Sequence, residues 1–189
     1  MGTWIVPELD AAHRLDSGPD PEDSAQAATP LLWLTRRIPA GAWESGVVHE
    51  AAAAQEVPAR VVSLAILCLS YDLRSRSRLK ARLEDGRLVG IVLPRGSVVR
   101  GGDLLLGPAL RARVVAAEED VIDAHGEDPA HLVRAAYHLG NRHVPVQFSA
   151  SWLRLGWDSV LADMLIGLGL TIRRRRAPFE PEAGAYAHR

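Results

Sequence analysis

The second half of the chain carries two stretches in which apolar residues recur at helical spacing. The first stretch begins at Asp128, a good N-cap, with Pro129 at the first helical position. We expect this helix to end in a left-handed residue at Gly140 or Asn141. Its apolar face comprises Leu132, Val133, Ala136 and Leu139.

The second helix is expected after Asp158 or Ser159 and ends at Gly169. Its apolar face comprises Val160, Leu161, Met164, Leu165 and Leu168. Runs typical of strands surround the two helices, at residues 111–122 (bent around an acidic triplet), 144–148, 152–155 and 170–174. The order β-α-β-β-α-β predicts a ferredoxin-like domain.

The first half is dominated by short strands and turn residues. Residues 79–83 alternate apolar and basic side chains at period two, and Glu84-Asp85-Gly86 is a hairpin turn in which Gly86 takes positive φ. Further strands are expected at residues 31–34, 61–69, 88–93, 97–99 and 104–106. Many short strands at this spacing predict a small all-β domain. The fold class is therefore α+β with two domains.

The hydrophobic pattern also divides the chain into segments. Residues 1–29 are rich in Pro, Asp, Glu, Ser and Ala, and are expected to form a disordered leader. We expect the β-rich domain to span residues 30–107 and the ferredoxin-like domain 108–177. Residues 178–189 are then expected to form a mobile tail.

Composition narrows the class of protein. The 189 residues are 48% hydrophobic and 24% charged, with a formal net charge of −1, so the whole chain has no attraction for nucleic acid or an acidic membrane. The single Cys68 excludes an intrachain disulfide and a cysteine-cluster metal site. The longest apolar run is half the length of a membrane span, and the N-terminus lacks a secretory signal pattern. A cytoplasmic protein is expected.

Polar chemistry concentrates in the corner after the first helix, residues 137–147. This corner holds His138, Asn141, Arg142 and His143. His143 is either a metal ligand or a helix-end histidine. His138 lies five residues earlier, outside i,i+4 spacing, so a structural role or a supporting role beside a metal site is expected. Asn141 and Arg142 are expected to hold the turn.

Six blocks of the sequence resemble the urease accessory proteins of the UreE family, the nickel metallochaperones. These blocks are residues 77–79 with 84–87, 93–96, 100–103, 137–145, 160–165 and 177–186. The resemblance implies a β-rich domain similar to peptide-binding chaperone modules, followed by a ferredoxin-like metal-binding domain. It also makes residues near 43–62 an insertion.

The resemblance further implies a homodimer in which His143 of both subunits binds Ni(II). Such a protein hands the metal to a urease-maturation GTPase and so to apo-urease. Imidazole ligands suit Ni(II), and Zn(II) or Cu(II) can bind the same site. A symmetric interface supplies two copies of each residue, which an open two-histidine site requires.

The sequence departs from the family pattern near the second helix and in the tail. Where many members carry histidines, this chain has Trp157-Asp158-Ser159, so Asp158 is a secondary ligand candidate and more simply an N-cap. The tail has one histidine, His188, which is a candidate to complete the site. We expect about one ion per dimer.

Two other functions compete with metal delivery. One is a protein-interaction module of urease assembly that has lost metal binding, since the auxiliary histidines are missing. The other is an RNA-binding ferredoxin-like domain, raised by Arg173, Arg174, Arg175 and Arg176. The expected aromatic-and-basic motif is absent from the central strands, so no nucleic acid is expected. Without a nucleophile elbow, Walker loop or HExxH, no enzyme is expected either.

Overall fold

The computed structural model describes residues 31–44 and 64–183. Predictions for the leader 1–29, the insertion 43–62 and His188 lie wholly or mostly outside these residues. The described elements of the first part are β1 (Leu32–Leu34), β2 (Arg36–Ile38), α1 (Ala40–Glu44), β3 (Leu64–Leu69), α2 (Tyr71–Arg74), β4 (Arg78–Arg82), β5 (Leu88–Val92), β6 (Leu104–Leu106) and β7 (Arg111–Ala116). The second part has β8 (Glu118–His125), α3 (Pro129–Gly140), β9 (Gln147–Phe148), β10 (Trp152–Gly156), α4 (Ser159–Gly167) and β11 (Thr171–Pro178).

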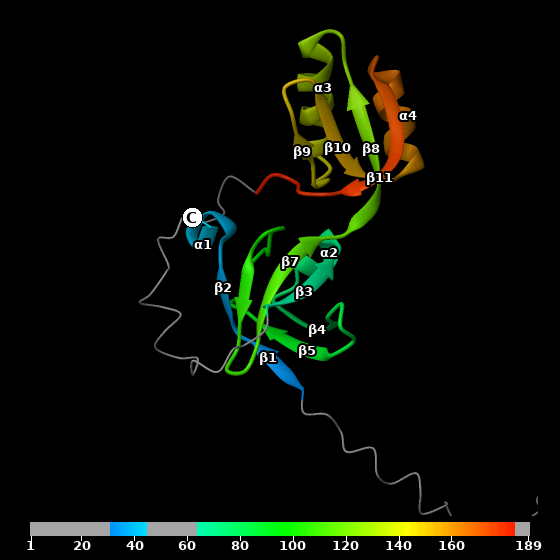
Figure 1. Cartoon of the computed structure of the whole chain (residues 1–189). Coiled ribbons are helices and arrows are strands. Elements are labelled where there is room, and N and C mark those ends of the chain that lie inside the picture. The colour runs from blue at the N-terminus through cyan, green and yellow to red at the C-terminus, as the bar shows by residue number, and fades with distance from the viewer. Residues whose placement is uncertain (1–30, 45–63, 184–189) are drawn as a thin grey trace, which may run out of the picture. The chain divides into compact units, whose positions relative to one another are not determined.

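The first part is β-rich and consists of two sheets (Figure 1). One sheet has the strand order β1-β5-β4 and the other β2-β6-β7-β3. The predicted hairpin turn is confirmed: Gly86 has φ 89°, and the Leu83 N–H donates to the Arg87 carbonyl oxygen at 2.9 Å. Both sheets contribute to one core, which includes Leu34, Leu67, Val89, Ile91, Leu105 and Val114. Residues 97–99, predicted as a strand, have no regular structure.

The second part has the predicted ferredoxin-like arrangement. Its antiparallel sheet has the order β11-β8-β10-β9, with α3 and α4 as the crossovers (Figure 1). One face of the sheet packs against both helices, because alternate residues of β8 and β10 share a core with them. That core includes Ile122, Ala124, Leu132, Leu139, Leu155 and Leu165. The protein is therefore α+β with two domains. Among the described helices, none has the length and apolar character needed to cross a membrane.

The predicted strand 111–122 is wrong as a single element, because the chain changes sheets at Ala117. β7 pairs with β3 and β6 of the β-rich domain, whereas β8 pairs with β10 and β11. The two halves of the predicted strand pair with different strands, and the order of apolar and polar residues along the chain does not show where the pairing changes. The strand pairing therefore moves the domain boundary from residue 107 to Ala117.

The predicted mobile tail is wrong for residues 178–183. β11 continues to Pro178, and Phe179 is buried with 5% of its surface exposed. The Phe179 ring packs edge-on against Tyr71, with 5.4 Å between ring centroids. Val121 and Ala177 complete this small apolar cluster. A single aromatic side chain among prolines has no periodicity, so the pattern alone gave no sign of its burial.

Both helices expose one residue that was predicted to be buried. On α3, Leu132, Ala135 and Leu139 face the core, and Val133 is 69% exposed. On α4, Val160 is 74% exposed, because it lies in the first turn beyond the edge of the core. These exposed apolar side chains are available to a partner.

Candidate metal-binding site

Helix α3 ends in a Schellman motif whose left-handed residue is His143. The Val144 N–H donates to the Leu139 carbonyl oxygen at 3.1 Å, and the His143 N–H donates to the Gly140 oxygen at 2.9 Å. His143 has φ 55°, the one positive φ among the described non-glycine residues. The predicted left-handed residues are wrong: Gly140 remains helical and Asn141 has φ −62°.

The backbone at His143 is unfavourable for an imidazole-bearing residue. A left-handed conformation costs an L-residue roughly 1–2 kcal/mol, and glycine is the usual occupant of this position. The surrounding hydrogen bonds hold the conformation nonetheless, and the side chain is exposed at the protein surface. A costly residue kept at such a position points to a functional role for its side chain.

The neighbouring polar residues of the turn have structural contacts. The Arg142 Nη1 donates to the His138 carbonyl oxygen at 3.1 Å, which satisfies one of the last carbonyls of α3. His138 is half-buried, with its ring edge-on to that of Tyr137 at 5.4 Å between centroids. The Asn141 side chain is exposed. His138 and His143 therefore lie at different depths, one against the helix and one at the surface.

Asp158 caps α4. Its Oδ1 accepts the Leu161 N–H at 2.9 Å, so the N-cap interpretation is confirmed. The carboxylate is exposed, and this hydrogen bond uses one of its oxygens. This capping hydrogen bond is a sufficient structural reason for an aspartate at position 158.

A complete metal site requires more donors than His143 alone provides. Within residues 31–44 and 64–183, no three His, Cys, Asp or Glu side chains gather closely enough to hold an ion. One exposed imidazole is one ligand, so the remaining ligands must come from a second copy, the last residues of the chain or water. The donor chemistry fits Ni(II), Zn(II) or Cu(II), which imidazole favours.

The chain segment that follows β11 lies against the strand beyond His143. The Glu182 N–H donates to the Val146 carbonyl oxygen at 2.8 Å, and the Glu180 N–H donates to the Gln147 Oε1 at 2.9 Å. The turn is thus held on one side by α3 and on the other by this segment. His143 lies three residues before Val146 in the chain.

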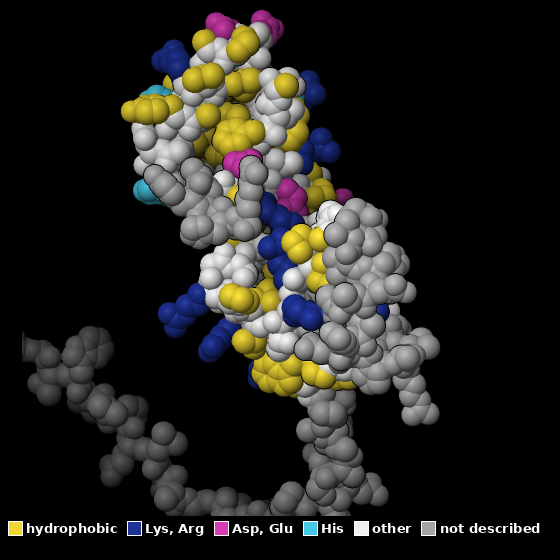
Figure 2. Space-filling model, turned by 90° about the vertical axis from the view of Figure 1, so that its left-hand side faces the viewer, with side chains coloured by type: hydrophobic (Ala, Val, Ile, Leu, Met, Phe, Trp, Pro, Cys, Tyr) yellow, Lys and Arg dark blue, Asp and Glu magenta, His cyan; other side chains and the backbone are white. Residues whose placement is uncertain are grey.

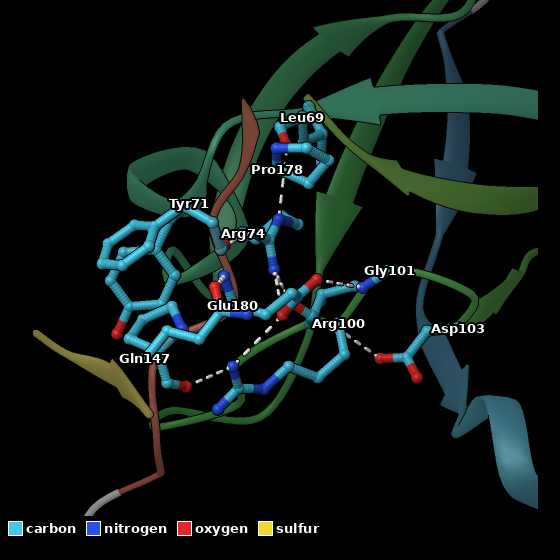
Figure 3. Close-up of polar contacts among 12 residues, drawn as sticks. Leu69, Tyr71, Arg74, Arg100, Gly101, Asp103, Gln147, Pro178 and Glu180 are labelled. Carbon is cyan, nitrogen blue, oxygen red and sulfur yellow. Dashed lines mark hydrogen bonds and ion pairs between the residues drawn. The ribbon is translucent and has the colours of Figure 1, made fainter. Parts of the chain in front are cut away.

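Glu180 also connects the segment to the β-rich domain (Figure 3). Its Oε2 accepts hydrogen bonds from Arg74 Nη1 at 3.0 Å and Arg100 Nη1 at 3.2 Å, and its Oε1 accepts the Gly101 N–H at 2.7 Å. Sequence reasoning missed Arg74, a residue of α2 that is 0% exposed. Its contact with Glu180 spans 106 residues, and no local pattern marks such a pair.

An exposed apolar surface accompanies the turn. Val133 and Tyr137, four residues apart on α3, are 69% and 66% exposed. Figure 2 shows apolar side chains gathered on the ferredoxin-like domain, with histidine side chains at the margin of that surface. Val133 and Tyr137 therefore lie on one exposed face of α3, the helix that ends before His143.

Comparison with known proteins agrees with this architecture. The model of the UreE urease accessory protein N-terminal domain matches residues 47–117, and that of the UreE C-terminal domain matches residues 119–189. The two matches meet at the sheet change near Ala117. This agreement supports the corrected domain boundary.

Individual relatives carry the name urease accessory protein UreE. Those of Burkholderia thailandensis, Burkholderia pseudomallei and Ralstonia nicotianae are each 54% identical to this chain over 121 residues, 64% of its length. The aligned part spans 57–60% of the length of these relatives. With both domain models matched in order, the chain belongs to the UreE family of urease accessory proteins.

Proposed function

We propose that this protein binds Ni(II) and delivers it during the maturation of urease, with His143 of two subunits as the shared ligands. The strained backbone at His143 carries the proposal, because a glycine would serve the turn better. The expected partners are a urease-maturation GTPase and apo-urease in the cytoplasm. The proposed role has no catalytic step.

The proposed homodimer forms through the ferredoxin-like domain. A two-fold axis near the end of α3 repeats every residue close to it, so one exposed imidazole becomes two. The exposed Val133 and Tyr137 beside the turn supply apolar area for that interface. Pairing across the axis therefore provides both the second ligand and the contact surface.

His188 is the proposed additional ligand from the chain end. Glu182 is bonded to Val146, which lies at most about 10 Å from His143 along three extended residues. His188 is six positions beyond Glu182, a reach of up to about 20 Å. His188 is therefore within reach of His143 in the same subunit.

A site with two or three imidazoles suits a carrier. Such a site binds less tightly than a closed four-ligand site and leaves positions open for a receiving protein. The ligands must be neutral, so binding competes with protonation and weakens as the pH falls. Asp158 is engaged in capping, so we assign it no more than a minor role.

Calorimetric titration with Ni²⁺ tests the proposal. We expect saturation near one ion per dimer and loss of binding in His143→Ala, with the dimer retained in light scattering. The matched control is His138→Ala, which removes a nearby half-buried imidazole and should leave the stoichiometry unchanged. His188→Ala should weaken the binding without abolishing it.

The competing interaction module makes a different prediction. In that case the wild-type dimer shows no binding at micromolar Ni²⁺, and the His143→Ala variant still associates with the urease-maturation partners. If calorimetry detects no Ni²⁺ binding by the wild-type protein, metal delivery is rejected and the interaction module remains as the function.

A further inference from the structure

Two blocks of the family resemblance meet in space although the metal site uses neither. Residues 100–103 lie in the β-rich domain, and the described part of the other block, residues 177–183, begins at the end of β11. The two blocks join through the Glu180 cluster, which consists of Arg74, Arg100, Gly101 and Glu180 (Figure 3). The question is what this contact does for the histidine turn.

The cluster is built around a buried cation. Arg74 donates from Nε to the Leu69 carbonyl oxygen at 3.2 Å, from Nη1 to the Val99 oxygen at 3.1 Å and from Nη2 to the Phe179 oxygen. With Glu180 as the fourth partner, all three guanidinium nitrogens are hydrogen-bonded, as a buried charge requires. Leaving such a charge unpaired is costly, so Arg74 strongly favours an ordered Glu180.

The buried carboxylate of Asp103 fixes the other cation of the cluster, Arg100. Asp103 is 1% exposed, and its Oδ2 accepts the Arg100 N–H at 2.7 Å while Arg37 Nε pairs with the same oxygen. The Arg100 backbone is thereby held, and its Nη1 reaches both Glu180 Oε2 and the Pro181 carbonyl oxygen. Glu180 therefore meets a prearranged set of donors and not flexible surface side chains.

The opposite side of the same segment contacts the histidine turn. The Glu180 and Glu182 amides donate to Gln147 and Val146, four and three residues beyond His143 respectively. β9 has just two residues paired with β10, and Val146, which precedes it, packs into the domain core. The direction in which the chain leaves His143 is therefore fixed by this core contact together with the segment that Glu180 anchors.

We propose that Glu180 is a positioning residue for His143, and that its contacts with Arg74 and Arg100 couple the β-rich domain to the metal-binding turn. The inference rests on the proposed function. The coupling is reciprocal: if the cluster favours the binding-competent turn, a metal ion at that turn must also stabilise the cluster. A partner that disturbs the β-rich domain then weakens metal binding.

Metal affinity in a matched pair of variants tests this role. We expect Glu180→Gln, which removes the charge at nearly constant size, to bind Ni²⁺ at least about tenfold more weakly than the wild type. Glu182→Gln is the control, because its exposed side chain has no described contact while its backbone bond to Val146 remains. We expect its affinity to lie within about twofold of the wild type. Arg100→Gln tests the same contact if Glu180→Gln fails to fold.

Hydrogen exchange of the wild-type dimer gives a readout that a merely structural role would not move. We expect Ni²⁺ to slow the exchange of the Gly101, Glu180 and Glu182 amides several-fold, and to have no such effect in His143→Ala. A flat wild-type titration would overturn the proposed function and this inference with it. Tight wild-type binding that is equal in Glu180→Gln, or unchanged exchange at Gly101, would overturn this inference alone.

Discussion

At the scale of single residues, His143 serves the fold poorly and the proposed site well. It occupies the left-handed position of a helix-ending motif that glycine fills without strain. Its imidazole is exposed, and its neighbours Arg142 and Val144 complete the turn through their own contacts. Stability and the proposed metal binding therefore place opposite demands on this one position.

This opposition predicts that His143→Gly is a stabilising substitution that removes metal binding. Relief of the left-handed strain should raise the free energy of unfolding by roughly 0.5–1 kcal/mol, after the entropy of glycine in the unfolded chain is subtracted. Urea denaturation measures the change. Asn141→Gly is the control, since its φ of −62° is ordinary and glycine there should lower stability. If His143→Gly were less stable than His143→Ala, the inferred backbone strain at position 143 would be wrong.

At the scale of secondary-structure elements, short polar contacts fix helix ends and strand pairs. Asp158 starts α4, and Asp123 of β8 forms a two-point ion pair with Arg154 of β10 at 2.6 and 2.9 Å. Arg154 also stacks over Trp152, with its guanidinium carbon 4.9 Å from the ring centroid. These contacts stabilise the domain that carries His143 without involving His143 itself.

The cap at α4 yields a direct test of Asp158. We expect Asp158→Ala to lower the free energy of unfolding by about 1 kcal/mol, because the Leu161 N–H loses its acceptor. The Ni²⁺ stoichiometry and affinity should stay at wild-type values, and Asp158→Asn should recover most of the stability. A large loss of affinity in both variants would make Asp158 a ligand.

The ion pair in the sheet predicts a pH dependence of stability. Burial raises the pKa of the Asp123 carboxyl, but the hydrogen bonds and charge of Arg154 overcome this and hold the pKa below its usual range. The contribution of Asp123 to the free energy of unfolding is therefore fully present above about pH 5. This contribution is lost as the pH falls below the unfolded-state pKa of about 3.9 and through the lower folded-state pKa. The free energy of unfolding, measured by urea denaturation at several pH values, should fall less steeply below pH 4 in Asp123→Asn than in the wild type. The variant Asp163→Asn, at an exposed position, should follow the wild type.

At the scale of the whole molecule, each chain of 20.5 kDa has one His143, and the second ligand depends on the proposed dimer. The exposed side chains of Val133 and Tyr137 link the proposed interface to the turn. Within each subunit, Glu180 ties that turn to the β-rich domain. Metal binding should therefore respond both to dimerisation and to changes in a domain that contributes no ligand.

The dependence on dimerisation can be tested on α3. Tyr137→Glu places a charge at the proposed two-fold interface, and we expect the mass in light scattering to fall from about twice 20.5 kDa towards that of one chain. Ni²⁺ binding should weaken at least about tenfold, because two imidazoles no longer meet. Leu88→Glu, at an apolar position on the β-rich domain that is 51% exposed, is the control and should remain dimeric. A Tyr137→Glu dimer with unchanged affinity would place the interface elsewhere.

The sequence by itself determined the elements whose information is local. Helical spacing between Asp128 and Leu139 predicted α3, period two predicted the hairpin at Gly86, and the six resembling blocks indicated the family and His143. Each of these depends on residues close together in the chain, where backbone preference and side-chain periodicity act directly. The prediction erred at Val133, which a helical wheel places near the apolar face but the sheet does not cover.

Only the tertiary structure decided the features that depend on distant partners. The apolar run through Ala117 divides between two sheets because β7 and β8 find different neighbouring strands. The segment after Pro178 is ordered because Arg74, more than a hundred residues earlier, needs the Glu180 carboxylate. A buried charge requires a hydrogen-bonding or charged partner close to it in space. The local sequence does not show which distant residue will be that partner, because only folding brings the two together.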